Sequence, residues 1–156
     1  LSGIVAIDGN SEVIGWVVGG AGSLGSGSAW KGQQEIQILT KEGYDVVVPR
    51  SDLNSSLPFP GFNTFFYYPD SQCIGIPIGN DFYPGVVHYV SARSKLFYSP
   101  KDSAIATYTN VYQSNAASYC NAYSGSITGF PIYSNNPDIT GVPNEGYTSP
   151  IRIEHR

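Results

Sequence analysis

The sequence predicts an all-β protein, built as an antiparallel β-sandwich or barrel of about ten short strands with one disulfide. Runs of β-branched and aromatic residues recur about every 8–12 residues and are separated by Gly, Pro, Asn and Asp. No segment keeps a helical period over about ten residues, and the helix candidate is a single turn at residues 113–118. The 156 residues fit one domain, so we expect residues 1–156 to form a single domain.

The central feature is a predicted hairpin at residues 64–79, TFFYYPDSQCIGIPIG. Its first half is β-branched and aromatic, and such residues fit a half-buried pleated strand. A Pro-Asp-Ser turn follows. Ile74, Ile76 and Ile78 then alternate with Gly and Pro, which predicts a second strand with Cys73 at the corner. We expect the fold to be organised around this hairpin.

Two further hairpins are predicted before it. Residues 3–7 and 12–18 are apolar and flank an Asp-Gly turn, a strong hairpin signal. Residues 33–40 and 44–48 flank a Lys-Glu-Gly turn. The segments between these strands are rich in Gly, Ser or Pro and are expected to be loops, at residues 19–28 and 50–62. The second loop contains Asn54 in a glycosylation sequon, which is a weak motif.

The C-terminal half shows the same alternation of apolar runs and turns. Strands are expected at residues 86–92, 96–99, 104–113, 130–133 and 147–154, and residues 118–124 carry Cys120. Pro77 and Pro150 interrupt such runs, so we expect each at a sheet edge or a bulge.

Composition narrows the function classes. Charged residues are 13% of the chain and its net charge is −4, so a nucleic-acid partner lacks the basic surface that it requires. No apolar run is long enough to span a membrane. Low charge with many Tyr, Gly and Ser is typical of secreted β-proteins, which predicts an extracellular or cell-surface location. The chain starts at Leu1 without methionine, as a mature product without its signal peptide or a segment of a longer protein would.

The two cysteines, Cys73 and Cys120, show no metal-ligand spacing. In a secreted domain the favoured interpretation is one disulfide between them, and the alternative is two buried free thiols.

Residues for catalysis are sparse, and we expect no enzyme activity and no cofactor. His88 lies within a predicted strand, where a histidine satisfied by its neighbours is the ordinary case and a catalytic base the alternative. His155 is the next-to-last residue. The twelve acidic residues lie mostly in predicted turns, so a catalytic pair of carboxylates for glycoside hydrolysis is the weakest hypothesis. Asp8, Asn10 and Glu12 alternate like the start of a calcium loop but lack its later ligands, so we predict a hairpin turn and no metal.

Aromatic residues give the strongest functional indication. Candidate ligand-binding or interface aromatics are Trp30, Tyr67, Tyr108 and Tyr112. Exposed rings of this kind bind sugars or form subunit contacts, and the alternative is that they are ordinary core residues.

Several segments together resemble a largely uncharacterised family of secreted bacterial all-β proteins. Residues 7–15, IDGNSEVIG, are similar to its VDANGKVVG-type opening, and residues 64–78 to its LFFxSxDCxGxPY hairpin, here with Ser71-Gln72 inserted. Residues 147–154, YTSPIRIE, resemble its FTPPFxVE ending. The resemblance implies export, a disulfide and an all-β fold. Some members lie behind collagen-like or stalk segments, which implies surface display, and the family supplies no catalytic residues.

These observations predict an extracellular structural or adhesive module, displayed on a cell surface or assembled as a filament subunit. The alternative is a carbohydrate-binding module, and a hydrolase is a weaker third reading. We expect self-association through an uncharged N-terminal strand made of Gly3, Ile4, Val5, Ala6 and Ile7. Such a strand usually completes its own sheet, and otherwise it adds to a neighbour's sheet.

Overall fold

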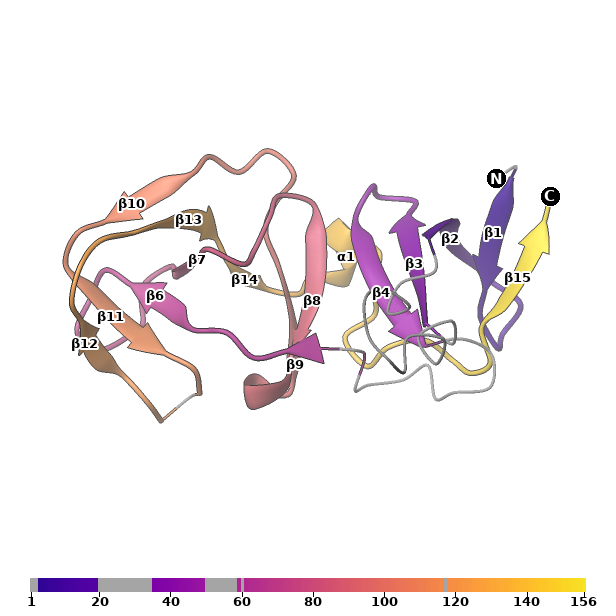
Figure 1. Ribbon diagram of the computed structural model, residues 1–156. Helices are drawn as coiled ribbons and strands as arrows, with labels where there is room; N and C mark the ends of the chain where they lie inside the picture. Colours follow the sequence, from indigo (N-terminus) through magenta and orange to yellow (C-terminus); the bar gives the residue numbers. More distant parts are fainter. Residues whose placement is uncertain (1–2, 20–34, 50–58, 60, 117) are drawn as a thin grey trace, which may run out of the picture. The chain divides into compact units, whose positions relative to one another are not determined.

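The structure, a computed structural model, is nearly all β, as the sequence predicts (Figure 1). It describes residues 3–19, 35–49, 59, 61–116 and 118–156. These residues form two sheets, a 3₁₀ turn (η2, Ser91–Arg93), one short helix (α1, Pro137–Thr140) and strands β1 to β15, more than the expected number.

The chain divides into two compact units. The first consists of Leu1–Pro60 with Asn136–Arg156, and the second of Gly61–Asn135. Each is described by itself below, and a single domain over residues 1–156 stays a prediction.

The first unit contains an antiparallel run of strands in the order β4-β3-β2-β1-β15. They are β1 (Ile4–Ile7), β2 (Val13–Gly19), β3 (Glu35–Thr40), β4 (Asp45–Pro49) and β15 (Arg152–His155). The two predicted N-terminal hairpins are therefore present. In β3, buried and half-buried residues alternate strictly, because successive side chains of a strand point to opposite faces.

The core of this unit is mainly aliphatic, and buried threonines connect α1 to it. The buried aliphatic side chains are Val5, Ile7, Ile36, Ile38, Val46, Val48 and Ile151. Thr40 Oγ1 donates to the Thr140 carbonyl oxygen over 2.7 Å. The side chain of Asn136 caps α1 by accepting from Asp138 N, and Gly141 ends the helix at a φ of 75°.

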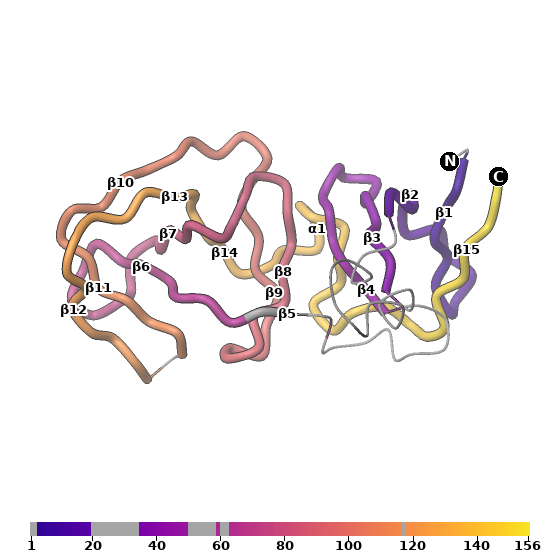
Figure 2. The backbone as a smooth tube through the Cα atoms, in the orientation of Figure 1, coloured from indigo at the N-terminus to yellow at the C-terminus, as the bar shows by residue number. Residues whose placement is uncertain are grey.

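The second unit contains a six-stranded antiparallel sheet and a smaller set of strands. The order of the larger sheet is β10-β13-β7-β6-β11-β12. Its strands are β6 (Phe66–Tyr68), β7 (Ile78–Gly79), β10 (Ala106–Tyr108), β11 (Val111–Ser114), β12 (Asn121–Tyr123) and β13 (Ile127–Pro131). The smaller set is β14 (Tyr133–Ser134), β9 (Lys95–Tyr98) and β8 (Val86–Val90), with β5 (Gly61–Phe62) parallel to β8. Figure 2 traces both sets.

An aromatic core lies between the two sets of strands, so this unit is a β-sandwich. Phe66 of β6 packs edge-on against Phe97 of β9 with ring centroids 4.9 Å apart, and against Phe82. Val90 of β8 and Ile132 belong to the same cluster. Tyr67 points to the opposite face of the larger sheet, where it packs with other apolar residues.

The second strand of the central hairpin is shorter than predicted. Only Ile78 and Gly79 form β7, while Ile74 is 81% exposed and Ile76 is also exposed. The carboxylate of Asp70 accepts backbone N–H groups from Gln72, Ile74 and Gly75, and these hydrogen bonds fold the segment into a turn. The prediction of a strand from residue 74 is therefore wrong, because side-chain-to-backbone bonds replace a ladder here.

The predicted helical turn at residues 113–118 is also wrong. Gln113 and Ser114 belong to β11, where Gln113 pairs with Tyr67 on one side and Asn121 on the other. The ladder bonds on both sides of β11 outweigh the weak local helix signal of this segment.

Candidate functional sites: a cationic cleft and two strand edges

The predicted disulfide is present and fixes one corner of the second unit. Cys73 and Cys120 are bonded, across 47 positions of the sequence. Cys73 lies in the turn that Asp70 organises, with a φ of 53°, and Cys120 directly precedes β12. The bond therefore ties the turn after β6 to the start of the outermost strand of the larger sheet.

Asp70 holds this corner through its charge as well as its geometry. The hydrogen bond from the Ile74 N–H, with further ones from Gly75 and Gln72, lowers the pKa of Asp70 below its ordinary value. The carboxylate is therefore ionised at neutral pH and is engaged in the turn.

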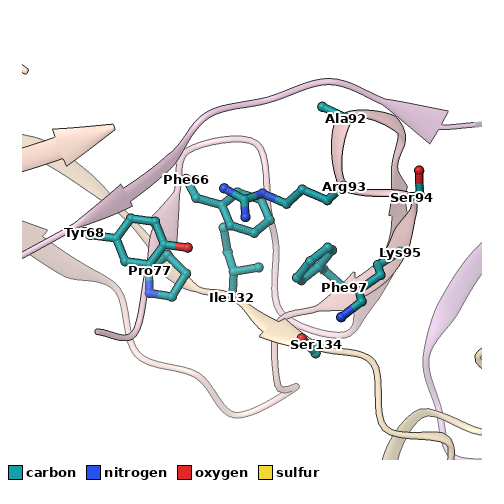
Figure 3. Close-up of a pocket in the computed structure, with 10 residues that line it drawn as sticks. All are labelled: Phe66, Tyr68, Pro77, Ala92, Arg93, Ser94, Lys95, Phe97, Ile132 and Ser134. Atoms are coloured by element: carbon teal, nitrogen blue, oxygen red, sulfur yellow. The ribbon is translucent and has the colours of Figure 1, made fainter. Parts of the chain in front are cut away.

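A cleft of about 440 Å³ opens between the two sets of strands in the second unit (Figure 3). Its apolar lining comes from Phe66 of β6, Phe97 of β9 and Ile132, with Pro77 beside them. Its polar lining consists of the cations Arg93 and Lys95 and the hydroxyl groups of Tyr68, Ser94 and Ser134. A cavity of this size, partly apolar and with a few polar groups, is typical of small-ligand sites.

Arg93 is the most constrained side chain of this cleft. Its Nη2 donates to Ser114 Oγ over 2.8 Å and to the Ser114 carbonyl oxygen over 3.3 Å. The guanidinium carbon lies 4.1 Å from the centroid of the Phe66 ring. Its Nε is buried and has no hydrogen-bond partner within the described part of the chain. Burial raises the pKa of Tyr68, and the neighbouring Arg93 charge partly opposes that shift.

Lys95 provides the second cation of the cleft. It is exposed at the start of β9 and follows Ser94, which adopts a left-handed backbone conformation after η2. Residues 93–95 lie between the predicted strands 86–92 and 96–99, where the sequence indicates an ordinary turn. The sequence does show two cations in a turn between two apolar strands. It does not show which other side chains lie next to that turn in the fold.

Of the three candidate tyrosines, Tyr108 packs against the core cluster that contains Tyr67, and Tyr112 lines a separate hollow. Tyr67 is only 8% exposed and belongs to the core, so its interpretation as a ligand-facing ring is corrected. Tyr108 is half-buried and donates its hydroxyl hydrogen to the Ile76 carbonyl oxygen. Tyr112 lines a hollow of about 260 Å³ together with Asn110 and Tyr123. Trp30 lies outside the described residues.

The histidines lie in different settings. His88 is half-buried in β8, with its ring edge-on to Phe82 at 5.3 Å, and burial lowers its pKa to about 4. The imidazole is therefore neutral at pH 7. His155 ends β15 and is exposed.

The acidic segment at Asp8 forms a hairpin turn. The Asp8 carboxylate accepts the N–H groups of Asn10 and Glu12 at 2.9 and 3.0 Å. Within the described ranges, no group of three or more His, Cys, Asp or Glu side chains is placed to hold a metal ion. In the same residues, no helix has the length and apolar character to cross a membrane.

The predicted assembly strand lies inside its sheet. β1 pairs with β2 on one side and β15 on the other, so it completes its own sheet, the first of the two expected options (Figure 1). The outer strand on that side is β15, which carries Arg152, Glu154 and His155. A role for residues 3–7 in contacts between copies stays a prediction. Because β1 is paired on both sides, it has no open edge that would support this role.

Uncharged edges occur instead in the six-stranded sheet of the second unit. Its two outermost strands are β10, Ala106–Tyr108, and β12, Asn121–Tyr123. Neither contains a charged residue, and all three residues of β12 are exposed. Sequence reasoning missed these edges because strand order, unlike strand character, is not visible in local patterns.

Comparisons of this chain with known proteins found no related protein. No protein-family model, curated protein or solved structure matches this chain significantly.

Proposed function

We propose that this chain is an extracellular structural or adhesive module, displayed on a cell surface or assembled as a filament subunit. The observation that carries this proposal is the pair of uncharged edges, β10 and β12, at opposite ends of the six-stranded sheet.

Open strand edges promote association unless something prevents it. A free edge exposes unpaired N–H and C=O groups, and monomeric proteins protect such edges with charged side chains, proline or bulges. β15 follows that rule, since Arg152 and Arg156 lie within 4 Å of Glu154 along it. β10 and β12 do not, so they are the edges that favour pairing with another chain.

The positions of these edges also favour a chain of subunits over a closed pair. When the β12 edge of one copy pairs with the β10 edge of the next, each contact joins two different surfaces. Such heterologous contacts produce an open filament unless the rotation between copies closes a ring. Each edge is only three residues long, so a single contact is weak and depends on many copies held close together.

The disulfide supports both the edge and the compartment. Because Cys120 directly precedes β12 and is bonded to Cys73, the outer strand is anchored before any partner arrives. Preorganisation of this kind lowers the entropic cost of association. Disulfides persist in oxidising compartments, which supports an extracellular location. The resemblance to secreted bacterial proteins supports the same proposal.

The test is a charge introduced at the edge. Ala122 is the exposed middle residue of β12, and Ala122→Lys introduces the side chain that natural edges use for protection. We expect the wild-type chain to form species larger than a monomer as its concentration rises, and Ala122→Lys to remain monomeric. Ala122→Ser is the matched control and should associate like the wild type. Equal association of the lysine and serine variants would refute the edge proposal.

A second candidate, a carbohydrate-binding module, is favoured by the hollow at Tyr112. Its lining combines the rings of Tyr112 and Tyr123 with the Asn110 amide and the Thr109 hydroxyl, which are groups that stack on and hydrogen-bond to sugars. A glycan array would show defined hits that Tyr112→Ala abolishes. An array without hits among uncharged glycans, or uncharged-glycan hits that survive this change, would remove the candidate.

A further inference from the structure

The cleft beside Arg93 contrasts with the charge of the chain as a whole. The net charge is −4, yet the ten described residues that line the cleft include two cations and no Asp or Glu. We propose that this cleft binds an acidic saccharide. A uronic acid unit would place its carboxylate at Arg93 and Lys95 and its ring against the apolar lining.

Arg93 is arranged to bind a carboxylate. Its Nη2 is held by Ser114 and its plane rests on Phe66, so its orientation is set before a ligand arrives. Because Nη2 donates to Ser114 and Nε is buried, a carboxylate in the cleft would accept a charge-assisted hydrogen bond from Nη1. In addition, the buried Nε of Arg93 has no hydrogen-bond partner among the residues that the structure describes, and a neighbouring anion would offset part of the cost of that unsatisfied donor.

Lys95 and Arg93 flank the cleft from neighbouring parts of one turn. Figure 3 shows the Arg93 guanidinium over Phe66, and the Lys95 ammonium beside Phe97 and Ser134. Two cations around one partly enclosed cavity concentrate positive potential there, because the apolar walls screen it less than water would. An anion is therefore attracted into the cleft in preference to the rest of the surface.

The remaining lining favours a sugar over a simple anion. A pyranose ring has an apolar face and a rim of hydroxyl groups. The cleft offers Ile132 and Pro77 for the face, and the hydroxyl groups of Tyr68 and Ser134 for the rim. Inorganic phosphate would leave this part of the cavity unused. A volume of about 440 Å³ holds one or two sugar rings and is at the small end of ligand sites, too small for an extended peptide.

This inference goes beyond the proposed assembly and does not depend on it. The cleft and the β10 and β12 edges share no residue. Lys95→Gln should leave particle mass unchanged, and Ala122→Lys should leave saccharide binding unchanged. A failure of one proposal is therefore distinguishable from a failure of the other.

The test is calorimetric titration of the full chain with digalacturonate. We expect binding to wild-type protein and a loss of affinity of about tenfold or more in Lys95→Gln, because one charge-assisted contact is removed. Lys41→Gln removes the same charge from the turn between β3 and β4, outside the cleft, and should bind like the wild type. The dimethyl ester of digalacturonate, which has the same rings without charge, should bind at least about tenfold more weakly.

Two further measurements identify which part of the ligand the cleft recognises. Ser134→Ala removes a hydroxyl from the lining and leaves both cations, so it should weaken binding of digalacturonate and leave any binding of inorganic phosphate unchanged. Near-ultraviolet circular dichroism checks that each variant keeps its tyrosine packing. The proposal is overturned if digalacturonate does not bind, if its ester binds equally well, if Lys95→Gln binds like Lys41→Gln, or if phosphate competes fully at equal concentration.

Discussion

Removal of the Cys73–Cys120 bond should destabilise the second unit by about 4 kcal/mol. The magnitude follows from the 47 positions between the two cysteines, because an uncrosslinked unfolded chain regains the entropy of that loop. Both cysteines are only half-buried, so changing each to serine leaves little cavity and adds little to that figure. The perturbation is the double variant Cys73→Ser/Cys120→Ser.

The assay is urea unfolding followed by the near-ultraviolet circular dichroism of tyrosine, a residue that is abundant in this unit. The double variant and the wild type treated with a phosphine reductant should lose the same free energy of unfolding. A loss below about 1 kcal/mol in both would refute the reasoning, since it would mean that the unfolded chain without the bond gains little entropy from this loop. A loss in the variant without one in the reduced wild type would assign the effect to the serines.

Two further predictions concern buried groups. Tyr147 stacks on Phe59, and its buried hydroxyl has no hydrogen-bond partner among the described residues. Burial raises the pKa of Tyr147, and Tyr147→Phe should stabilise the chain by about 1 kcal/mol because it removes an unsatisfied buried group. Urea unfolding of this variant checks it, and a clear loss of stability would contradict it. His88 has a pKa of about 4 in the folded protein against about 6.5 when unfolded, so the unfolded state binds the extra proton between these values. Stability should therefore fall as pH drops from 6.5 towards 4, and His88→Gln should reduce that fall; a His88 resonance that titrates above pH 6 would contradict it.

Local periodicity predicted the strands of the first unit well, because their faces differ in burial. β3 and β4 lie where the alternation of Ile36 and Ile38 indicated a hairpin. The same rule failed at Ile74 and Ile76, because three hydrogen bonds to the Asp70 carboxylate fix the backbone conformation of that segment. The spacing of apolar residues contains no information about such bonds.

Other features had signals that were overlooked or had none. Helix α1 has Asn136 at its cap, Pro137 in its first turn and Gly141 after its end, which together are a recognisable pattern for a short helix. The cleft had no such pattern. Arg93 reaches Phe66 only because β6, η2 and β9 meet in the fold, and contacts of that range depend on strand order.

The most direct test of the proposed function is the particle mass of the intact, oxidised chain by light scattering over a wide concentration range. The account predicts a mass that grows with concentration in the wild type and in Ala122→Ser, and a constant monomer mass in Ala122→Lys. A wild-type chain that stays monomeric at the highest concentration, or an Ala122→Lys variant that grows as the wild type does, would contradict it.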